Sequence, residues 1–326
     1  MSDSFTPTPV LIDTDCGVDD ALALILALRS PELHVHAIVT VAGNVEVRQC
    51  TRNVLRVLSL LSPRTLPLVA QGSAKPIGRA LVTAKEVHGK DGLGGLDAHH
   101  SVRGMSRIRR NGAAVIVDFC STWKEQGTVI AVGPLTNIAR AWKRNPSALK
   151  KVGRIISMGG AFRIPGNTGP VAEFNYFVDP EAAQAIITSG IPVDIVPLDI
   201  THQVTLLRSE VERHRSERPG PVSRFVSEVT RFYMEYHEVT EGFAGGYLHD
   251  PVAVAASVDP TIVEFVQASV AVETEGRFGR GMSVRFATGG ACTGDGKRAK
   301  SGRVRIAHRI DRERFLNWFH ERLWSS

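Results

Sequence analysis

Short apolar runs rich in β-branched residues alternate with helical patterns along this chain, and this alternation restricts the fold more than any other feature. We expect strands at residues 9–15, 36–43, 127–133, 154–160 and 193–200. Segments with helical character follow them, such as DDALALILAL after the first strand and DPEAAQAIITSG after the fourth. Strand–helix–strand units at this spacing favour parallel pairing with helices on both faces of the sheet. The sequence therefore predicts an α/β fold around a mostly parallel central sheet.

Two segments interrupt this rhythm. Residues 71–112 are rich in glycine and charge, which predicts a long, mobile loop. Residues 206–248 read as a helical insert. The C-terminal part predicts a strand pair within residues 270–286 and a closing amphipathic helix. No shift in composition marks a linker, so we expect a single domain over residues 1–326.

The composition narrows the class of protein. The chain has 326 residues, of which 43% are hydrophobic, enough for a large core. Its net charge is +6, but the basic residues are scattered, so we expect no nucleic-acid partner. No apolar run approaches the roughly 20 residues of a membrane helix. The N-terminus lacks a signal-peptide profile, and four cysteines without CxxC spacing favour a reducing compartment. We therefore expect a cytoplasmic protein without a membrane partner.

The segment DTDCGVDD, residues 13–20, places four aspartates in eight positions beside an apolar helix. Two unit charges 4 Å apart repel by about 4 kcal/mol at an effective dielectric constant near 20. A helix start accommodates one or two carboxylates, so the surplus needs a counter-charge. All-oxygen ligands favour Ca²⁺ or Mg²⁺ over zinc. An EF-hand is excluded, because Val18 and Leu24 stand where that loop requires Gly and Glu.

Polar residues also follow the other expected strands. In a parallel sheet, ligands bind at the carboxyl ends of the strands. The residues expected at that edge are Asp13, Asp15, Asp19, Asp20, Asn44, the GPLTN turn, Met158, the loop 167–175, His249 and Asp250. We expect these side chains to gather around one site.

DTDCGVDD resembles the DTDxGxDD signature of the nucleoside hydrolases, the inosine–uridine preferring N-ribohydrolases. Further segments match that family in its order: TVAGN (40–44), HGKDGLGG (88–95), GPLTNIA (133–139), SMGGAF…GN…VAEFN (157–175), DPEAA (179–183), LDITHQ (198–203) and HDP (249–251). The resemblance spans nearly the whole chain and implies a single-domain, Rossmann-like nucleoside hydrolase fold.

The resemblance implies calcium-dependent hydrolysis of the N-glycosidic bond of ribonucleosides, as used in purine or pyrimidine salvage. Free base and ribose are the products, through an oxocarbenium-like transition state with a metal-bound water as nucleophile. The implied Ca²⁺ ligands are Asp15, Asp20, Asp250 and the backbone carbonyl of Val132. Asp15 would also be the general base.

The resemblance also implies a substrate set. Asp19, Asn44 and Asn175 would hold the ribose 2′- and 3′-hydroxyls, so that Asp19 joins Asp15 and His249 in the catalytic set. The remaining contacts are Asn167 and Glu173 toward the 5′-hydroxyl, Met158 beneath the sugar, and His88 and Phe174 near the base. His249 would donate a proton to the leaving base.

The preferred base stays open at this stage. Tyr236, Phe243 and Tyr247 lie in the segment that forms the base pocket in this family, but they match no member of known preference. His249 beside Asp250 favours the non-specific or pyrimidine-leaning groups. Cys16 stands where the family usually has proline. The resemblance also implies a homodimer or homotetramer with a small-molecule ribonucleoside as substrate.

Two other functions compete. A magnesium-dependent aspartyl phosphohydrolase also begins with DxD after an apolar strand, but Cys16 and Gly17 fit that chemistry poorly. A catalytically silent nucleoside- or ribose-binding protein could share the fold, although the complete set of aspartates argues against loss of activity.

Overall fold

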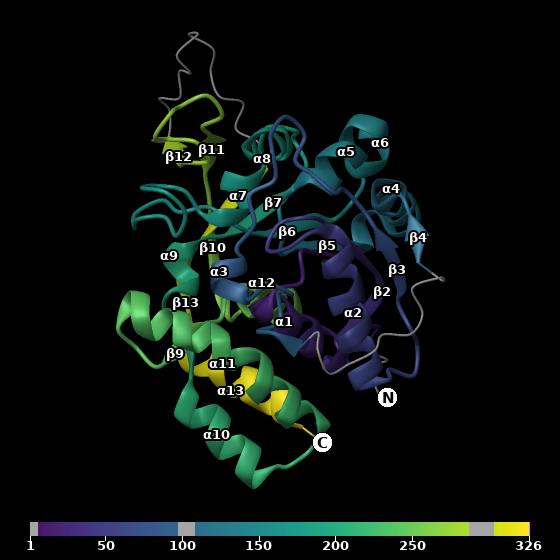
Figure 1. Cartoon of the computed structure of the whole chain (residues 1–326). Coiled ribbons are helices and arrows are strands. Elements are labelled where there is room, and N and C mark those ends of the chain that lie inside the picture. The colour runs from purple at the N-terminus through teal and green to yellow at the C-terminus, as the bar shows by residue number, and fades with distance from the viewer. Residues whose placement is uncertain (1–5, 97–107, 287–302, 326) are drawn as a thin grey trace.

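The computed structural model describes residues 6–96, 108–286 and 303–325, and one nine-stranded sheet runs through all three parts (Figure 1). In spatial order its strands are β10 (Val263–Gln267), β13 (Val304–Ile310), β7 (Val193–Val196), β6 (Arg154–Met158), β5 (Thr128–Ala131), β1 (Thr8–Thr14), β2 (Leu33–Thr40), β3 (Leu68–Gln71) and β4 (Arg109–Arg110). Neighbouring strands are parallel except for the antiparallel edge pair β10–β13. The expected mostly parallel sheet is confirmed.

Helices cover both faces of this sheet. One face carries α1 (Val18–Arg29), α2 (Val47–Leu61), α11 (Pro221–Glu241), α12 (His249–Val258) and α13 (Arg312–Trp324). The other carries α4 (Gly112–Trp123), α5 (Thr136–Arg144), α6 (Pro146–Leu149) and α8 (Pro180–Ile187). Alternating side chains of β1 feed both cores, since Val10 and Ile12 pack with the first layer and Leu11 with the second. The near-continuous apolar runs of the sequence follow from this burial on both faces.

The order of the strands determines where a ligand can bind. From β1 the chain adds β2, β3 and β4 on one side, and it then returns to place β5 against the opposite edge of β1. This change of direction opens a crevice at the carboxyl ends of β1 and β5. The aspartate segment follows β1 directly, and Val132 follows β5.

All five expected strands exist, with bounds that differ by a few residues. The second one spans Leu33–Thr40, so that residues 41–43 already belong to the turn above the sheet. The fifth ends at Val196, four residues early, and residues 198–200 belong to the helix α9 (Leu198–Thr201) instead. The expected strand pair is the separate hairpin β11 (Ser269–Val272) and β12 (Ser283–Phe286), and α13 is the closing helix. In Figure 1 this hairpin lies at the opposite end of the molecule from α10 (Arg208–Glu217), α11 and α13.

The helical insert consists of α10 and α11, closed at its base by the antiparallel pair β8 (Thr205–Leu207) and β9 (Gly245–Tyr247). Within the expected loop, residues 72–84 are irregular and α3 (Lys85–His88) forms one short helical turn. Residues 97–107 of that loop lie outside the described part. The remaining short helices are α7 (Phe174–Val178) and α9 (Leu198–Thr201).

Two further observations concern cellular context. Among the described residues, no helix combines the length and apolar character needed to cross a membrane. Cys16, Cys50 and Cys120 are buried free thiols, while Cys292 lies outside the described residues.

Candidate active site

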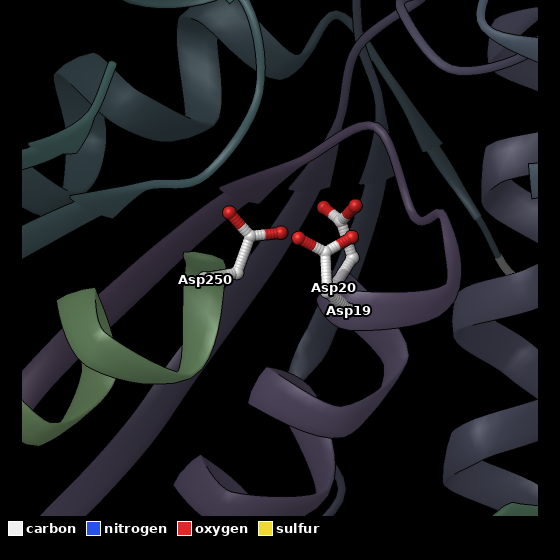
Figure 2. A group of neighbouring side chains, drawn as sticks. All are labelled: Asp19, Asp20 and Asp250. Carbon is white, nitrogen blue, oxygen red and sulfur yellow. The ribbon is translucent and has the colours of Figure 1, made fainter. Parts of the chain in front are cut away.

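Three carboxylates meet at the N-terminal ends of two helices. Asp19 and Asp20 lie in the first turn of α1, and Asp250 lies in the first turn of α12. Oxygen atoms of all three lie within 4.8 Å of one another. Figure 2 shows the carboxylates of Asp20 and Asp250 facing one another across the gap between the two helix ends. Backbone N–H groups at helix N-termini favour negative charge, which explains part of this arrangement.

Asp15 and Asp20 lie beneath the cavity and are inaccessible to solvent. Asp20 accepts hydrogen bonds from the Thr14 hydroxyl at 2.5 Å and the Gly17 amide at 2.8 Å. Asn44 connects the two carboxylates, because its backbone N–H donates to Asp15 Oδ2 at 2.7 Å and its side chain donates to Asp20 Oδ2 at 3.1 Å. No described group donates a hydrogen bond to Asp15 Oδ1.

Burial and mutual repulsion raise the pKa values of these carboxyl groups. Burial raises the pKa of Asp19 to about 8, and the nearby charge of Asp20 adds to the shift. Burial also raises the pKa of Asp15 and of Asp250 well above its usual value, with repulsion from the neighbouring aspartates as the further cause. Four carboxylates that oppose one another's charge need either protons or a cation.

The donor set fits a hard divalent cation. The carboxylate oxygens that lie within 4.8 Å of one another belong to Asp19, Asp20 and Asp250, and Asp15, a predicted ligand, is not in this group. Val132 lines the same cavity, and the buried Oδ1 of Asp15 has no described hydrogen-bond partner. Neither a cysteine nor a histidine belongs to the group that lies within 4.8 Å. Oxygen-only donors suit Ca²⁺ or Mg²⁺.

A cavity of about 530 Å³ opens above these carboxylates. The predicted site residues that line it are Asp19, Asn44, His88, Val132, Met158, Asn167, Glu173, Phe174, Asn175, His249 and Asp250. Asp15 and Asp20 are fully buried and do not line it, and neither do Asp13, the GPLTN turn or residues 170–172, which were expected at the same edge. The tertiary structure thus brings most of the predicted ligand and substrate residues to one cavity.

One wall presents amide and carboxylate groups that the chain holds firmly. Asn175 donates from Nδ2 to the carbonyl oxygens of Val132 and Met158, each at 3.2 Å. Glu173 caps α7 and accepts hydrogen bonds from the backbone N–H groups of Gly160, Asn175 and Tyr176. Burial raises the pKa of Glu173 to about 7, although these three donors act in the opposite direction.

His88 is a neutral imidazole with a defined tautomer. Its Nδ1 accepts the backbone N–H of Val18 at 3.1 Å, and its ring stacks on Tyr233 with 5.5 Å between centroids. Burial, aided by the proximity of His237, lowers the pKa of His88 to about 3. Since Nδ1 accepts, the proton of the neutral ring is on Nε2. His88 therefore offers the cavity a hydrogen-bond donor.

His249 begins α12 directly before Asp250. Its Nδ1 lies 2.8 Å from the Thr201 hydroxyl, and its ring centroid is 5.5 Å from that of His202. Burial lowers the pKa of His249 well below its usual value, and the nearby histidines add to the shift. Because of this lowered pKa, the His249 imidazole is neutral near pH 7.

The sequence placed Tyr236 and Tyr247 in the base-pocket segment, and both line the cavity, but it gave no role to His202, Tyr233, His237, Thr240 or Glu241, which line it too. His202 stacks on Tyr247 with 4.3 Å between centroids, and the Tyr247 hydroxyl donates to Glu241 at 2.6 Å. The α11 residues that line the cavity are Tyr233, Tyr236, His237, Thr240 and Glu241. Their spacing of three and four places them on one helix face, which is a signal that the sequence contained. Phe243 contacts Tyr247 and His237 but does not line the cavity.

Comparisons with known proteins agree with this geometry. Residues 10–317 match the family model described as inosine-uridine preferring nucleoside hydrolase. The chain is 40% identical over 322 residues to a pyrimidine-specific ribonucleoside hydrolase of Salmonella enteritidis, covering 97% of this chain and 98% of that one. A plant nucleoside hydrolase structure superposes with a TM-score of 0.89 at 32% identity, covering 98% of this chain and 100% of that one. A purine-preferring ribonucleoside hydrolase from Gardnerella vaginalis gives a TM-score of 0.85 at 31% identity, covering 97% and 98%. The chain therefore belongs to the inosine–uridine preferring nucleoside hydrolase family of enzymes.

Proposed function

We propose that this protein hydrolyses the N-glycosidic bond of ribonucleosides to free base and ribose, and that it needs Ca²⁺ to do so. The observation that carries the proposal is the group of buried carboxylates Asp19, Asp20 and Asp250, which meets a cavity lined by amide and imidazole groups. Asp15, Asp20, Asp250 and the Val132 carbonyl would hold the ion. When bound, Ca²⁺ would orient a water molecule and lower its pKa.

The carboxylates also suit the transition state of this reaction. Cleavage of the bond between C1′ and the base nitrogen develops positive charge on the ribose. Negative groups fixed in a site from which water is excluded stabilise that charge more than they stabilise the neutral substrate. Asp15 would act as the general base, and this role is supported by an Oδ1 without described donors beside an Oδ2 that accepts the Asn44 N–H.

The amide wall is suited to a ribose. Asp19, Asn44 and Asn175 would bind the 2′- and 3′-hydroxyls, and Asn167 and Glu173 the 5′-hydroxyl. Met158, buried at the cavity wall, would pack beneath the sugar. Buried polar groups left unpaired are costly, so a site of this kind should reject a 2′-deoxyribose strongly.

The opposite side of the cavity would bind the base. His88 supplies a donor from Nε2, and Phe174 lies at the cavity rim. His249 would donate a proton to the leaving base. Its lowered pKa disfavours an imidazolium in the absence of substrate, so His249 would first take up a proton from solvent, helped by the negative charge that develops on the departing base, and then pass it to that base.

We propose pyrimidine ribonucleosides as the preferred substrates. The relative from Salmonella enteritidis that covers nearly the whole chain carries the description pyrimidine-specific. The structural neighbour described as purine-preferring is less similar in sequence, at 31%. We further propose a single-domain, cytoplasmic homodimer or homotetramer in which part of the loop 71–112 closes over the substrate.

The test is ribose release from uridine, cytidine, inosine, adenosine and guanosine before and after chelation. We expect release from uridine and cytidine to exceed release from the purine nucleosides, to stop on chelation and to return with Ca²⁺. Binding of ribonucleosides without release of base would instead identify a silent binding protein. Restoration by Mg²⁺ but not by Ca²⁺ would contradict the assignment of the ion.

A further inference from the structure

Asn137, the second residue of α5, lies behind the cavity and is completely buried. Its side-chain Nδ2 donates to Asp13 Oδ1 at 2.7 Å and to the Thr40 carbonyl at 3.0 Å. Its Oδ1 accepts the backbone N–H of Ser73 at 2.8 Å. One amide therefore joins the carboxyl ends of β1, β2 and β3 to the start of α5.

These contacts fix the amide in one orientation. A flipped amide would place its NH₂ group against the Ser73 N–H and its oxygen against two acceptors. Gly72 packs directly on the amide, since a Cβ there would lie 2.3 Å from Asn137 Oδ1. The pocket around Asn137 thus admits a flat amide and little else.

The residues that Asn137 holds are bonded to the proposed ion site. The carbonyl of Asp13 accepts the Val132 N–H at 2.8 Å, which aligns the strand end whose carbonyl lines the cavity. Directly after Thr40, the Val41 N–H donates to the Thr14 carbonyl at 3.0 Å. The same turn continues to Asn44, whose backbone N–H holds Asp15.

We propose that Asn137 is a positioning residue for the cation site. It sets the spacing between the ends of β1, β2 and β5, and through them the relative positions of the Asp15 carboxylate and the Val132 carbonyl. The inference rests on the proposed function, because it assigns Asn137 to the ion that this function requires. Partners of this kind act by orienting ligands, and their loss commonly lowers metal affinity about 10- to 100-fold.

A matched control stands next to Asn137 in the chain. Thr136 is also buried, and its hydroxyl donates to Asp179 Oδ2 at 2.6 Å. That bond connects α5 to Asp179, the N-cap residue of α8. Each of the variants Asn137→Ala and Thr136→Val removes one buried polar group, but only Asn137→Ala removes the hydrogen bond to β1.

The experiment measures Ca²⁺ affinity by titration calorimetry on chelated full-length protein, with thermal unfolding in parallel. We expect Asn137→Ala to lower the affinity by about 10- to 100-fold, and Thr136→Val to leave it within about twofold of wild type. At saturating Ca²⁺, we expect the kcat of Asn137→Ala to approach that of wild type, because the substitution weakens binding of the ion.

An exchange of the pair guards against a variant that does not fold. Asn137→Asp faces Asp13 with a second acceptor, whereas adding Asp13→Asn restores one donor and one acceptor between the same positions. We expect the double variant to bind Ca²⁺ several-fold more tightly than Asn137→Asp alone. Unchanged affinity in Asn137→Ala, or equal losses in Thr136→Val, would overturn this inference while leaving the proposed function intact. Wild-type protein that binds no Ca²⁺ would overturn both.

Discussion

Asp20 and Asp250 come from distant parts of the chain, yet their carboxylates face one another from the first turns of α1 and α12 (Figure 2). Each helix is buried along nearly its whole length, and the two pack side by side beneath the sheet. Packing of two apolar helices therefore produces a polar site at their N-termini. The helix ends offer partial positive charge, but less than the carboxylates require.

The substitution Asp15→Asn should abolish turnover while the fold survives. Asparagine keeps an oxygen that can accept the Asn44 N–H, but it cannot take up a proton as a base. We expect ribose release to fall at least about 10³-fold, within the usual range for a lost general base. Thermal unfolding with Ca²⁺ present should show an intact fold. Activity near that of wild type would contradict the role of Asp15.

Asp250→Ala should lose Ca²⁺ together with activity. Removal of a direct ligand should lower the Ca²⁺ affinity by more than the roughly 10- to 100-fold that follows loss of a residue that only orients a ligand. Asp259→Ala is the matched control, because Asp259 follows the other end of the same helix and pairs with Arg314 at 2.8 Å. Equal calcium content in Asp250→Ala and in the control would refute the assignment of Asp250.

The loss of activity in His249→Ala should depend on the leaving group. We expect a loss of about 10²- to 10⁴-fold in kcat for uridine, the range for a missing general acid. An activated aryl riboside, whose leaving group needs no proton, should lose much less. Thr201→Val, which removes the partner of Nδ1, should show a weaker effect in the same direction. Equal losses on both substrates would show that His249 does not act as the acid.

Glu173→Gln should discriminate between substrates with and without a 5′-hydroxyl. Above pH 7 the Glu173 carboxyl, with its pKa of about 7, is mostly ionised. A hydrogen bond to a charged group contributes about 1.5–3 kcal/mol, so KM for uridine should then rise at least about tenfold. 5′-Deoxyuridine should be affected much less, and it serves as the internal control for any distortion of the α7 cap. If KM rises by the same factor for both nucleosides, Glu173 does not contact the 5′-hydroxyl.

Chelated protein should lose stability as the pH rises from 6.5 to 8.5. The pKa of Asp13 and of Asp19 is raised from 3.8 to about 8 in the folded state, mainly by burial. The folded state therefore binds more protons than the unfolded state in this window, and the free energy of unfolding falls by at most about 1.4 kcal/mol per pH unit for each group. His88, whose pKa is about 3, is neutral in the folded state throughout this window.

Denaturant unfolding at several pH values, with chelator or with Ca²⁺, checks this expectation. Bound Ca²⁺ supplies the missing positive charge and should flatten the dependence on pH. A chelated protein whose free energy of unfolding is constant or increases across the window would argue against the buried, uncompensated carboxylates.

Much of the fold could be predicted from the sequence, because a strand that is buried on both faces of the sheet appears as a continuous apolar run. The apolar runs that became β1, β5, β6 and β7 could hardly lie anywhere but within a covered sheet. The short strands β3, β4 and β10, which lie at or next to the edges of the sheet, were not predicted. They span two to five residues, too few to show a periodic pattern.

The residues on the side of the cavity proposed to bind the base were harder to predict from the sequence. Tyr233 and His237 lie on α11, which the sequence predicted only as part of a helical insert, and His202 follows the short helix α9. Which face of α11 turns toward the cavity depends on how that helix packs against its neighbours. Such packing involves contacts between segments far apart in the chain, and local patterns do not encode them.

The sequence by itself determined the α/β class and, through four aspartates in eight positions, the need for positive charge at the end of β1. Both follow from local physics, since periodicity reflects burial and adjacent charges repel wherever the segment lies. Asp250 was already expected at the site, but only the tertiary structure showed that its carboxylate groups with Asp19 and Asp20 and that Asn137 joins three strand ends. These relationships depend on the strand order and on helix packing, which convert distant positions in the chain into neighbours within hydrogen-bond distance.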